Sequence, residues 1–300
     1  MHPDDAGDDE PLRAGASPED AENDPQQEPT EPPSPPSLHI LNQEEIDEEL
    51  DEEELDEAPR TVLITGANGN IGRKLREAWA DVYDLVLIDR HAAPGDDEMI
   101  VADLATWDES WVAYFDDVDT VIHLAGNPDD DAPWDALVGP NLDALANVLH
   151  AAAFGWVERV IFASSNHVMG RYRDLGDMPI TVDLPPRPDG PYGGTKLVGE
   201  RLGKSLAAAF DLTFIAIRVG WVQRGENRPE TLPDDWSRGL WLSDDDLIDL
   251  FEAAIEAELG DRTFLVVNGM SNNRGMRWDL TEANEWLGFE PADDSGEESL

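Results

Sequence analysis

The sequence predicts a doubly wound α/β fold, in which helices cover both faces of a parallel sheet. Three observations predict it. Short apolar runs alternate with longer helical patterns from residue 61 onward, a glycine-rich turn follows the first run, and polar residues follow several later runs. In such folds ligands bind beyond the carboxyl ends of the strands, so we expect the functional site at that edge of the sheet.

The predicted elements follow one another in a regular order. Strands are predicted at residues 61–65, 85–88, 99–102, 120–124, 159–163, 214–218 and 263–267. Helices are predicted at residues 70–80, 133–153, 192–209 and 244–259. This order, in which helices separate successive apolar runs, is that of parallel strands joined by crossover helices.

The chain is acidic throughout its length. Its 300 residues carry a formal net charge of −47, and residues 1–60 hold only 22 of the 67 acidic side chains. Such a surface repels nucleic acids and anionic membranes, so we expect neither as a partner. Salt screens the self-repulsion of such a surface, which suggests a halophilic protein that loses structure or activity as salt is lowered.

Residues 1–58 form a segment of different composition. They are rich in proline and acidic residues and contain no aromatic residue, so we expect a disordered acidic tail. A solubilising tail fits this composition better than an acidic interaction arm. The folded domain is then expected at residues 59–300, with residues 220–300 supplying most of the substrate side.

Several classes of protein do not fit the sequence. It has no cysteine, which excludes disulfides, thiolate chemistry and cysteine-based zinc sites, and we expect no metal. No apolar run approaches the roughly 20 residues of a membrane span. The first residues do not resemble a signal peptide, so we expect a cytoplasmic protein.

A glycine-rich turn lies between the first predicted strand and the first predicted helix. Gly66, Gly69 and Gly72 have the spacing G-x-x-G-x-x-G. The first permits a tight turn, the second lets the backbone approach a pyrophosphate, and the third allows close packing of helix and strand. The position between strand and helix predicts a dinucleotide site. The predicted contacts in this turn are Gly66, Asn68, Gly69, Asn70, Ile71 and Gly72.

The ends of the next strands extend this dinucleotide site. Asp89 ends the second strand, where a carboxylate can accept both hydroxyls of the adenosine ribose and repels a 2′-phosphate. This favours NAD over NADP, although Arg90 could bind that phosphate and Asp89 could merely end the strand. Asp103 and Leu104 end the third strand, where they can bracket adenine.

The fourth strand ends in small residues that allow the backbone to pass near the cofactor. Leu124, Ala125 and Gly126 are the predicted contacts there. His123 fits a core histidine better than a catalyst. Asn127 begins the following loop and is a candidate substrate contact.

A polar loop and a tyrosine–lysine pair predict the chemistry. Ser165, Asn166 and His167 follow the fifth strand, whereas Tyr192 and Lys196 lie one helical turn apart and point to the same face. A phenol, with an ordinary pKa of about 10, is a poor base at neutral pH, and a neighbouring ammonium favours the phenolate. The serine can hold the substrate oxygen while its proton leaves. This set suits hydride transfer from a carbinol to a nicotinamide.

Two glycines follow the tyrosine directly. Gly193 and Gly194 lie inside a predicted helix, where glycine is destabilising. We therefore expect a backbone or ligand to approach the start of this helix closely.

Taken together, these motifs resemble the extended short-chain dehydrogenase/reductase family over residues 60–294. The segments F-A-S-S-N-H-V-M-G (162–170) and W-L-S-D-D-D-L (241–247) are similar to the uronate dehydrogenase branch and related NAD-dependent sugar dehydrogenases. The resemblance implies a Rossmann-like sheet with a small C-terminal substrate-binding part, NAD as the cofactor and a sugar substrate. It also suggests a homo-oligomer.

The resemblance also implies a role for each residue of the polar set. Tyr192 would be the general base, and Lys196 would lower its pKa and bind a ribose. Ser165 would hold the reacting hydroxyl, and Asn166 and His167 would contact the sugar.

Other positions match or depart from the family's pattern. Asn141 matches an asparagine that supports the active site. Trp221 stands where the uronate enzymes have a serine, and Ala144 stands where the family has a glycine. For a substrate carboxylate, Arg238 is the best candidate and Arg173 is a second. These departures leave the identity of the sugar open.

The sequence thus predicts an NAD-dependent oxidoreductase that oxidises a hydroxyl, at the anomeric C1, of a small sugar, sugar acid or sugar phosphate. The first alternative is a nucleotide-sugar epimerase or dehydratase that retains its NAD. The second is a non-catalytic NAD(P)-binding regulatory protein, against which the intact set Ser165, Tyr192 and Lys196 argues.

Overall fold

A parallel sheet forms the centre of the protein. The computed structural model describes residues 59–296, and the predicted tail at residues 1–58 lies outside the described residues. The sheet has the order β3-β2-β1-β4-β5-β6-β7. Its strands are β1 (Thr61–Thr65), β2 (Asp84–Asp89), β3 (Ile100–Val101), β4 (Thr120–His123), β5 (Arg159–Ser165), β6 (Thr213–Val219) and β7 (Phe264–Gly269). The direction of winding reverses between β1 and β4, which confirms the predicted doubly wound α/β fold.

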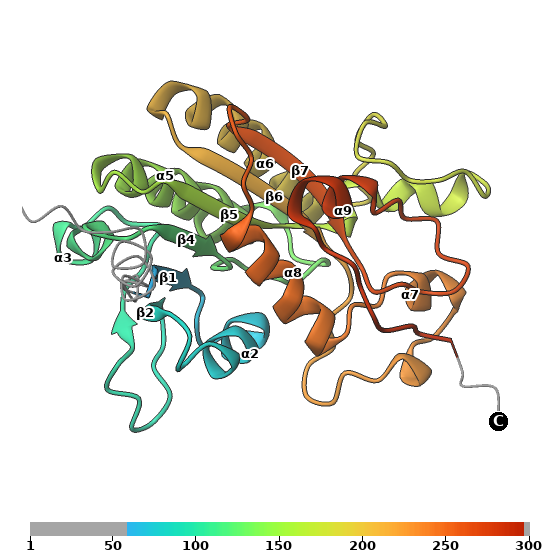
Figure 1. Ribbon diagram of the computed structural model, residues 1–300, viewed down its shortest axis with the longest axis horizontal. Coiled ribbons are helices and arrows are strands. Elements are labelled where there is room, and N and C mark those ends of the chain that lie inside the picture. Colours follow the sequence, from blue (N-terminus) through green and yellow to red (C-terminus); the bar gives the residue numbers. More distant parts are fainter. Residues whose placement is uncertain (1–58, 297–300) are drawn as a thin grey trace, which may run out of the picture. The chain divides into compact units, whose positions relative to one another are not determined.

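Helices cover both faces of this sheet (Figure 1). One face packs against α2 (Asn70–Ala78), α8 (Asp244–Glu256) and α9 (Thr281–Leu287). The other packs against α3 (Glu109–Val112), α5 (Ala144–Phe154) and α6 (Pro191–Phe210). Because successive strand residues point to opposite faces, each strand contributes to both apolar cores.

The predicted helix at residues 133–153 is divided into three parts. A short helix α4 (Trp134–Val138) is followed by a π-helical turn η2 (Gly139–Asp143) and then by α5. Pro140 lies in this turn and cannot donate a backbone hydrogen bond, so regular α-helical bonding is interrupted there. Such π-helical turns are frequent at functional sites, and this one carries Asn141.

Short elements gather beyond the carboxyl ends of β5 and β6. They are η3 (Asn166–Val168), η4 (Gly170–Asp174), η5 (Pro229–Thr231) and α7 (Asp235–Gly239), and a further short helix, η1 (Ala113–Phe115), follows α3. A third apolar cluster that includes Val168, Tyr172, Leu240 and Trp278 packs beneath them. None of the described helices is long and apolar enough to cross a lipid bilayer.

Some element boundaries differ from the predicted ones, and three short helices were not predicted. The helix predicted at 244–259 ends at Glu256, because the backbone of Ala257 is extended with ψ of 132°. The sequence did not predict α3, α7 or α9, which have four to seven residues and are too short for a helical pattern to repeat several times.

Candidate active site

The glycine-rich turn has the geometry of a dinucleotide cradle. Gly66 has φ of +73°, and a Cβ at this position would lie 2.7 Å from the backbone nitrogen of Ala125. A Cβ on Gly72 would collide with the carbonyl oxygen of Gly66. The turn leads into α2, whose first turn holds no acidic residue. The N-terminus of this helix therefore offers N–H groups and the positive end of the helix dipole to an anion.

Asp89 is held in place at the end of β2. Its Oδ2 accepts the N–H of Asn68 at 3.0 Å, and its Oδ1 accepts the N–H of His91 at 3.1 Å. Asp103 accepts the N–H of Ala105 in a similar way at 3.2 Å. Backbone groups thus fix both carboxylates in the region that the sequence predicts to bind adenosine.

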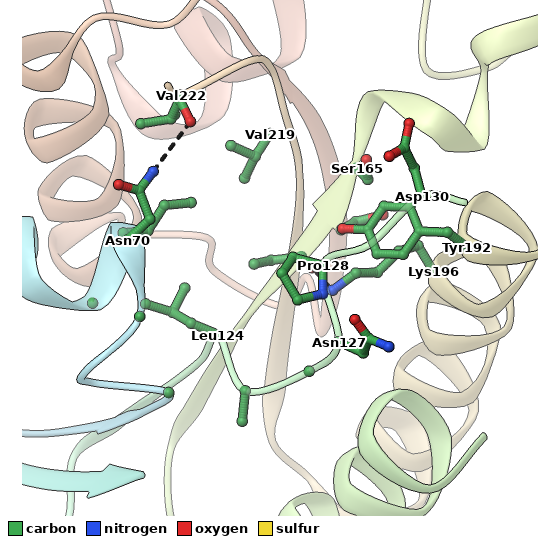
Figure 2. A pocket seen from close by; sticks show the side chains of 18 of the residues that line it. Asn70, Leu124, Asn127, Pro128, Asp130, Ser165, Tyr192, Lys196, Val219 and Val222 are labelled. Atoms are coloured by element: carbon green, nitrogen blue, oxygen red, sulfur yellow. Dashed lines mark hydrogen bonds between the residues drawn. The ribbon is translucent and has the colours of Figure 1, made fainter. Parts of the chain in front are cut away.

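Asn70 ties the glycine-rich turn to the segment that follows β6. Its side-chain amide donates to the carbonyl oxygen of Val222 at 3.1 Å (Figure 2) and to that of Gln223 at 3.3 Å. This amide is therefore bound to protein, and Asn70 shapes the wall of the cavity.

One cavity of about 920 Å³ joins the two predicted sets of residues. Every predicted cofactor and catalytic residue lines it, as do the predicted substrate residues Asn127, Ser165, Asn166 and His167. Arg238 does not line it. The guanidinium of Arg238 instead donates to the carbonyl oxygen of Leu232 at 3.2 Å and pairs with Asp235.

Lys196 and Tyr192 lie side by side on α6. The Lys196 Nζ donates to the carbonyl oxygen of Ala163 at 2.7 Å and lies 5.7 Å from the centre of the Tyr192 ring. Burial lowers the pKa of Lys196 to about 8. Figure 2 shows Tyr192, Lys196, Ser165 and Asp130 on the side of the cavity away from Asn70.

The pKa of Tyr192 differs from the sequence expectation. Burial raises it to about 12, the hydrogen bond with Ser165 lowers it, and the charge of Asp130 raises it further. The expected lowering by Lys196 is not found, and burial of the phenol has the largest effect. Tyr192 is therefore neutral at neutral pH in this structure.

His167 lies between two carboxylates. Its Nδ1 is 3.0 Å from Oδ2 of Asp189, and its Nε2 is 3.8 Å from Oδ2 of Asp130. Burial alone would lower the pKa of His167, but the hydrogen bond to Asp189 and the two negative charges raise it above its ordinary value. Its ring meets that of Tyr192 edge to face at 5.5 Å.

The loop after β4 is fixed by Asn141. Its Oδ1 accepts the N–H of Asn127 at 2.7 Å, and its Nδ2 donates to the carbonyl oxygen of Asn127 and to Oγ1 of Thr195, both at 3.2 Å. Asn141 thus connects this loop to α6.

The start of α6 packs closely against the polar loop. A Cβ on Gly193 would collide with the carbonyl oxygen of His167, which confirms the predicted close approach, whereas Gly194 has open space. Asn166, in the same loop, donates its side-chain amide to the carbonyl oxygen of Val219 at 3.2 Å.

His123 is a core residue, as predicted. Its Nδ1 lies 2.8 Å from Oγ1 of Thr65, and its ring stacks on Phe162 at 6.1 Å. Complete burial lowers its pKa to about 3, so it is neutral.

The structure adds residues that sequence reasoning missed. Asp130, Asp189, Arg224 and Trp236 all line the cavity. Two of them carried a weak signal, because Asp130 lies in the loop that begins at the predicted Asn127, and Asp189 lies shortly before Tyr192.

Comparison with known proteins agrees with this geometry. The model of the NAD dependent epimerase/dehydratase family matches residues 62–231. This chain belongs to that family. The chain is 34% identical over 250 residues to the L-arabinose 1-dehydrogenase (NAD(P)(+)) of Haloferax volcanii, covering 78% of this chain and 97% of that protein. It is 35% identical over 259 residues to the NAD-dependent glucose-6-phosphate dehydrogenase of the same organism, covering 79% and 94%.

A solved structure of the same family is also similar. The crystal structure of uronate dehydrogenase from Agrobacterium tumefaciens matches with a TM-score of 0.67 and 31% identity, covering 79% of this chain and 85% of that one. The family relatives thus include enzymes whose names specify a neutral sugar, a sugar phosphate and a uronate.

Proposed function

We propose that this protein is an NAD-dependent dehydrogenase that oxidises the anomeric hydroxyl of a small sugar. The observation that supports this most is that Ser165, Tyr192 and Lys196 line the same cavity as the glycine-rich turn. The names of its dehydrogenase relatives point in the same direction. The cradle formed by Gly66 and Gly72 fits a dinucleotide, which when bound supplies the hydride acceptor.

Side chains of the protein orient the sugar, transfer the proton and keep the cavity in shape. Ser165 orients the sugar hydroxyl. Tyr192 first releases its own proton to solvent and then, as the phenolate, accepts the proton of the sugar hydroxyl at its phenol oxygen. Lys196 holds a positive charge beside the phenol ring and supports the phenolate as the proton leaves. Asn141 holds the loop of Asn127 so that the cavity wall keeps its shape.

NAD is the proposed cofactor. Both oxygens of the Asp89 carboxylate already accept backbone N–H groups, which holds a negative charge where a 2′-phosphate would lie. Arg90 lines the same end of the cavity and is the residue that would tolerate that phosphate. The ratio of activities with NAD and NADP tests this assignment, and a preference for NADP would contradict it.

The test of the function is the formation of NADH in high-salt buffer with a panel of aldoses, aldohexuronates and hexose phosphates. We expect net NADH with at least one class and none with the Tyr192→Phe variant. Turnover of a nucleotide sugar without net NADH would instead indicate an epimerase. Bound NAD without turnover of any sugar would indicate a regulatory protein.

A further inference from the structure

The dinucleotide end of the cavity offers cations that have no acidic partner. Arg73 and Arg90 line this end, and Arg224 lines the cavity directly after Val222 and Gln223, which accept the Asn70 amide. None of these three arginines forms an ion pair with a carboxylate within residues 59–296. The carboxylates of Asp89 and Asp103 at the same end accept backbone N–H groups instead. An anionic ligand therefore meets arginines here without displacing a resident carboxylate.

At the sugar end, by contrast, Arg173 and His167 do have acidic partners. Arg173 lines this end, and its Nη2 lies 2.5 Å from Oδ2 of Asp234. Two other basic side chains line this end. His167 lies between Asp189 and Asp130, and Lys196 donates its Nζ to the carbonyl oxygen of Ala163 at 2.7 Å. An anionic group on the sugar would have to compete with these carboxylates, and close like charges are strongly unfavourable.

The other groups at the sugar end suit an uncharged sugar. Trp221 and Trp236 line the cavity and offer large apolar faces, while Asn127 offers neutral hydrogen-bonding groups. Trp236 is supported from behind by Trp278, with ring centres 5.9 Å apart. Trp221 is fixed by its backbone N–H, which donates to the carbonyl oxygen of Leu240 at 2.6 Å.

We propose that the substrate is an uncharged aldose, and that Asp130 and Asp189 exclude sugar acids and sugar phosphates. This inference rests on the proposed function and narrows its substrate class. Asp130 is the more direct determinant, because it faces the cavity beside Tyr192 and Ser165 and contacts His167 only at 3.8 Å (Figure 2). Asp189 acts in addition as the positioning residue of His167.

The test compares sugars that share one ring: glucose, glucuronate and glucose 6-phosphate, together with a neutral pentose, L-arabinose. We expect kcat/KM for the best neutral sugar to exceed that for either anion by at least about tenfold. The Asp130→Asn variant should raise the ratio of anionic to neutral kcat/KM by about tenfold. Asp131→Asn is the matched control, because it removes the neighbouring charge, which does not line the cavity, and it should leave the ratio unchanged.

Salt gives a second readout that needs no variant. If resident carboxylates repel the anion, added salt screens the repulsion and the ratio of anionic to neutral kcat/KM rises. If a cation binds the anion, added salt lowers that ratio. A falling ratio, a wild-type preference for an anion, or an unchanged ratio in Asp130→Asn would each overturn the proposal. Absence of NADH with every sugar would instead contradict the proposed function itself.

Discussion

The two ends of the active-site cavity are built by different means. The dinucleotide end depends on backbone geometry, since Gly66 has a positive φ and a Cβ there would meet Ala125. The sugar end depends on side chains that hold one another, as Asp189 holds His167. Backbone geometry of this kind tolerates few substitutions, whereas a network of side chains can be retuned one residue at a time. The names of the relatives specify different sugars, as expected if the sugar end varies within the family.

The largest expected effect is the loss of kcat in a Tyr192 variant. Tyr192→Phe removes the phenol oxygen, so kcat should fall by about 10³-fold while dinucleotide binding changes little. Steady-state kinetics and a fluorescence titration with NADH measure the two quantities. Tyr114→Phe, on an exposed side chain, should behave as wild type. Retained turnover in Tyr192→Phe would remove this residue as the base.

Gly66→Ala tests whether backbone geometry determines the dinucleotide end. The alanine would be strained by the positive φ, and its Cβ would lie 2.7 Å from the backbone nitrogen of Ala125. We therefore expect the free energy of unfolding to fall by more than about 2 kcal/mol and NAD binding to become weak. Gly95→Ala is the control, because its φ is +83° but the space around it is open. It should cost only about 1 kcal/mol and leave NAD binding intact. Equal effects in the two variants would show that close packing at Gly66 is unimportant. Thermal unfolding with and without NAD distinguishes these outcomes.

Asp189→Asn tests the side-chain network of the sugar end. Asp189 raises the pKa of His167, so its removal should lower that pKa, and the sugar KM should increase about tenfold. Because the pKa of His167 is higher in the folded state than its ordinary value of 6.5, protonation of His167 stabilises the fold. This stabilisation is fully present below pH 6.5 and is lost as the pH rises through the folded-state pKa. The stability difference between wild type and variant should therefore be largest in acid. NMR titration of the imidazole measures the pKa, with Asp131→Asn as the control, and an unchanged pKa would contradict the arrangement.

Arg224→Ala should have the smallest effect. Arg224 lines the cavity next to the segment that accepts the Asn70 amide and has no acidic partner in the described part of the chain, so its loss should weaken NAD binding about threefold to tenfold. The effect should diminish as salt increases. Arg201→Ala is the control, because Arg201 is exposed on α6 and does not line the cavity. Identical NAD affinities for Arg224→Ala and Arg201→Ala would exclude Arg224 from the site.

The sequence predicted the dinucleotide end better than the sugar end. The turn of Gly66 to Gly72 is contiguous and lies between a regular strand and helix, so local rules suffice to place it. The sugar end combines segments that are far apart in the sequence, and only the fold shows that Asp130 and Asp189 face His167. Nothing in the sequence distinguished Arg238, which turns to Asp235, from arginines that line the cavity.

The C-terminal part of the chain has two roles. Residues 220–300 are predicted to contribute most of the substrate side, and those of them that line the cavity lie between Gly220 and Leu240. The segments that follow, α8, β7 and α9, complete the sheet and its helical layer instead. The pKa of Tyr192 could not be predicted, because it depends on burial that no local pattern reveals.

The most direct test of the central claim, removal of a hydride from the anomeric carbon of a sugar, is isotope transfer. The best aldose of the panel is labelled with deuterium at C1, oxidised with wild-type protein and NAD, and the NADH is analysed by mass spectrometry. We expect one deuterium in each NADH formed. Unlabelled NADH would show that the hydride leaves another carbon, and C1 would then not be the site of oxidation.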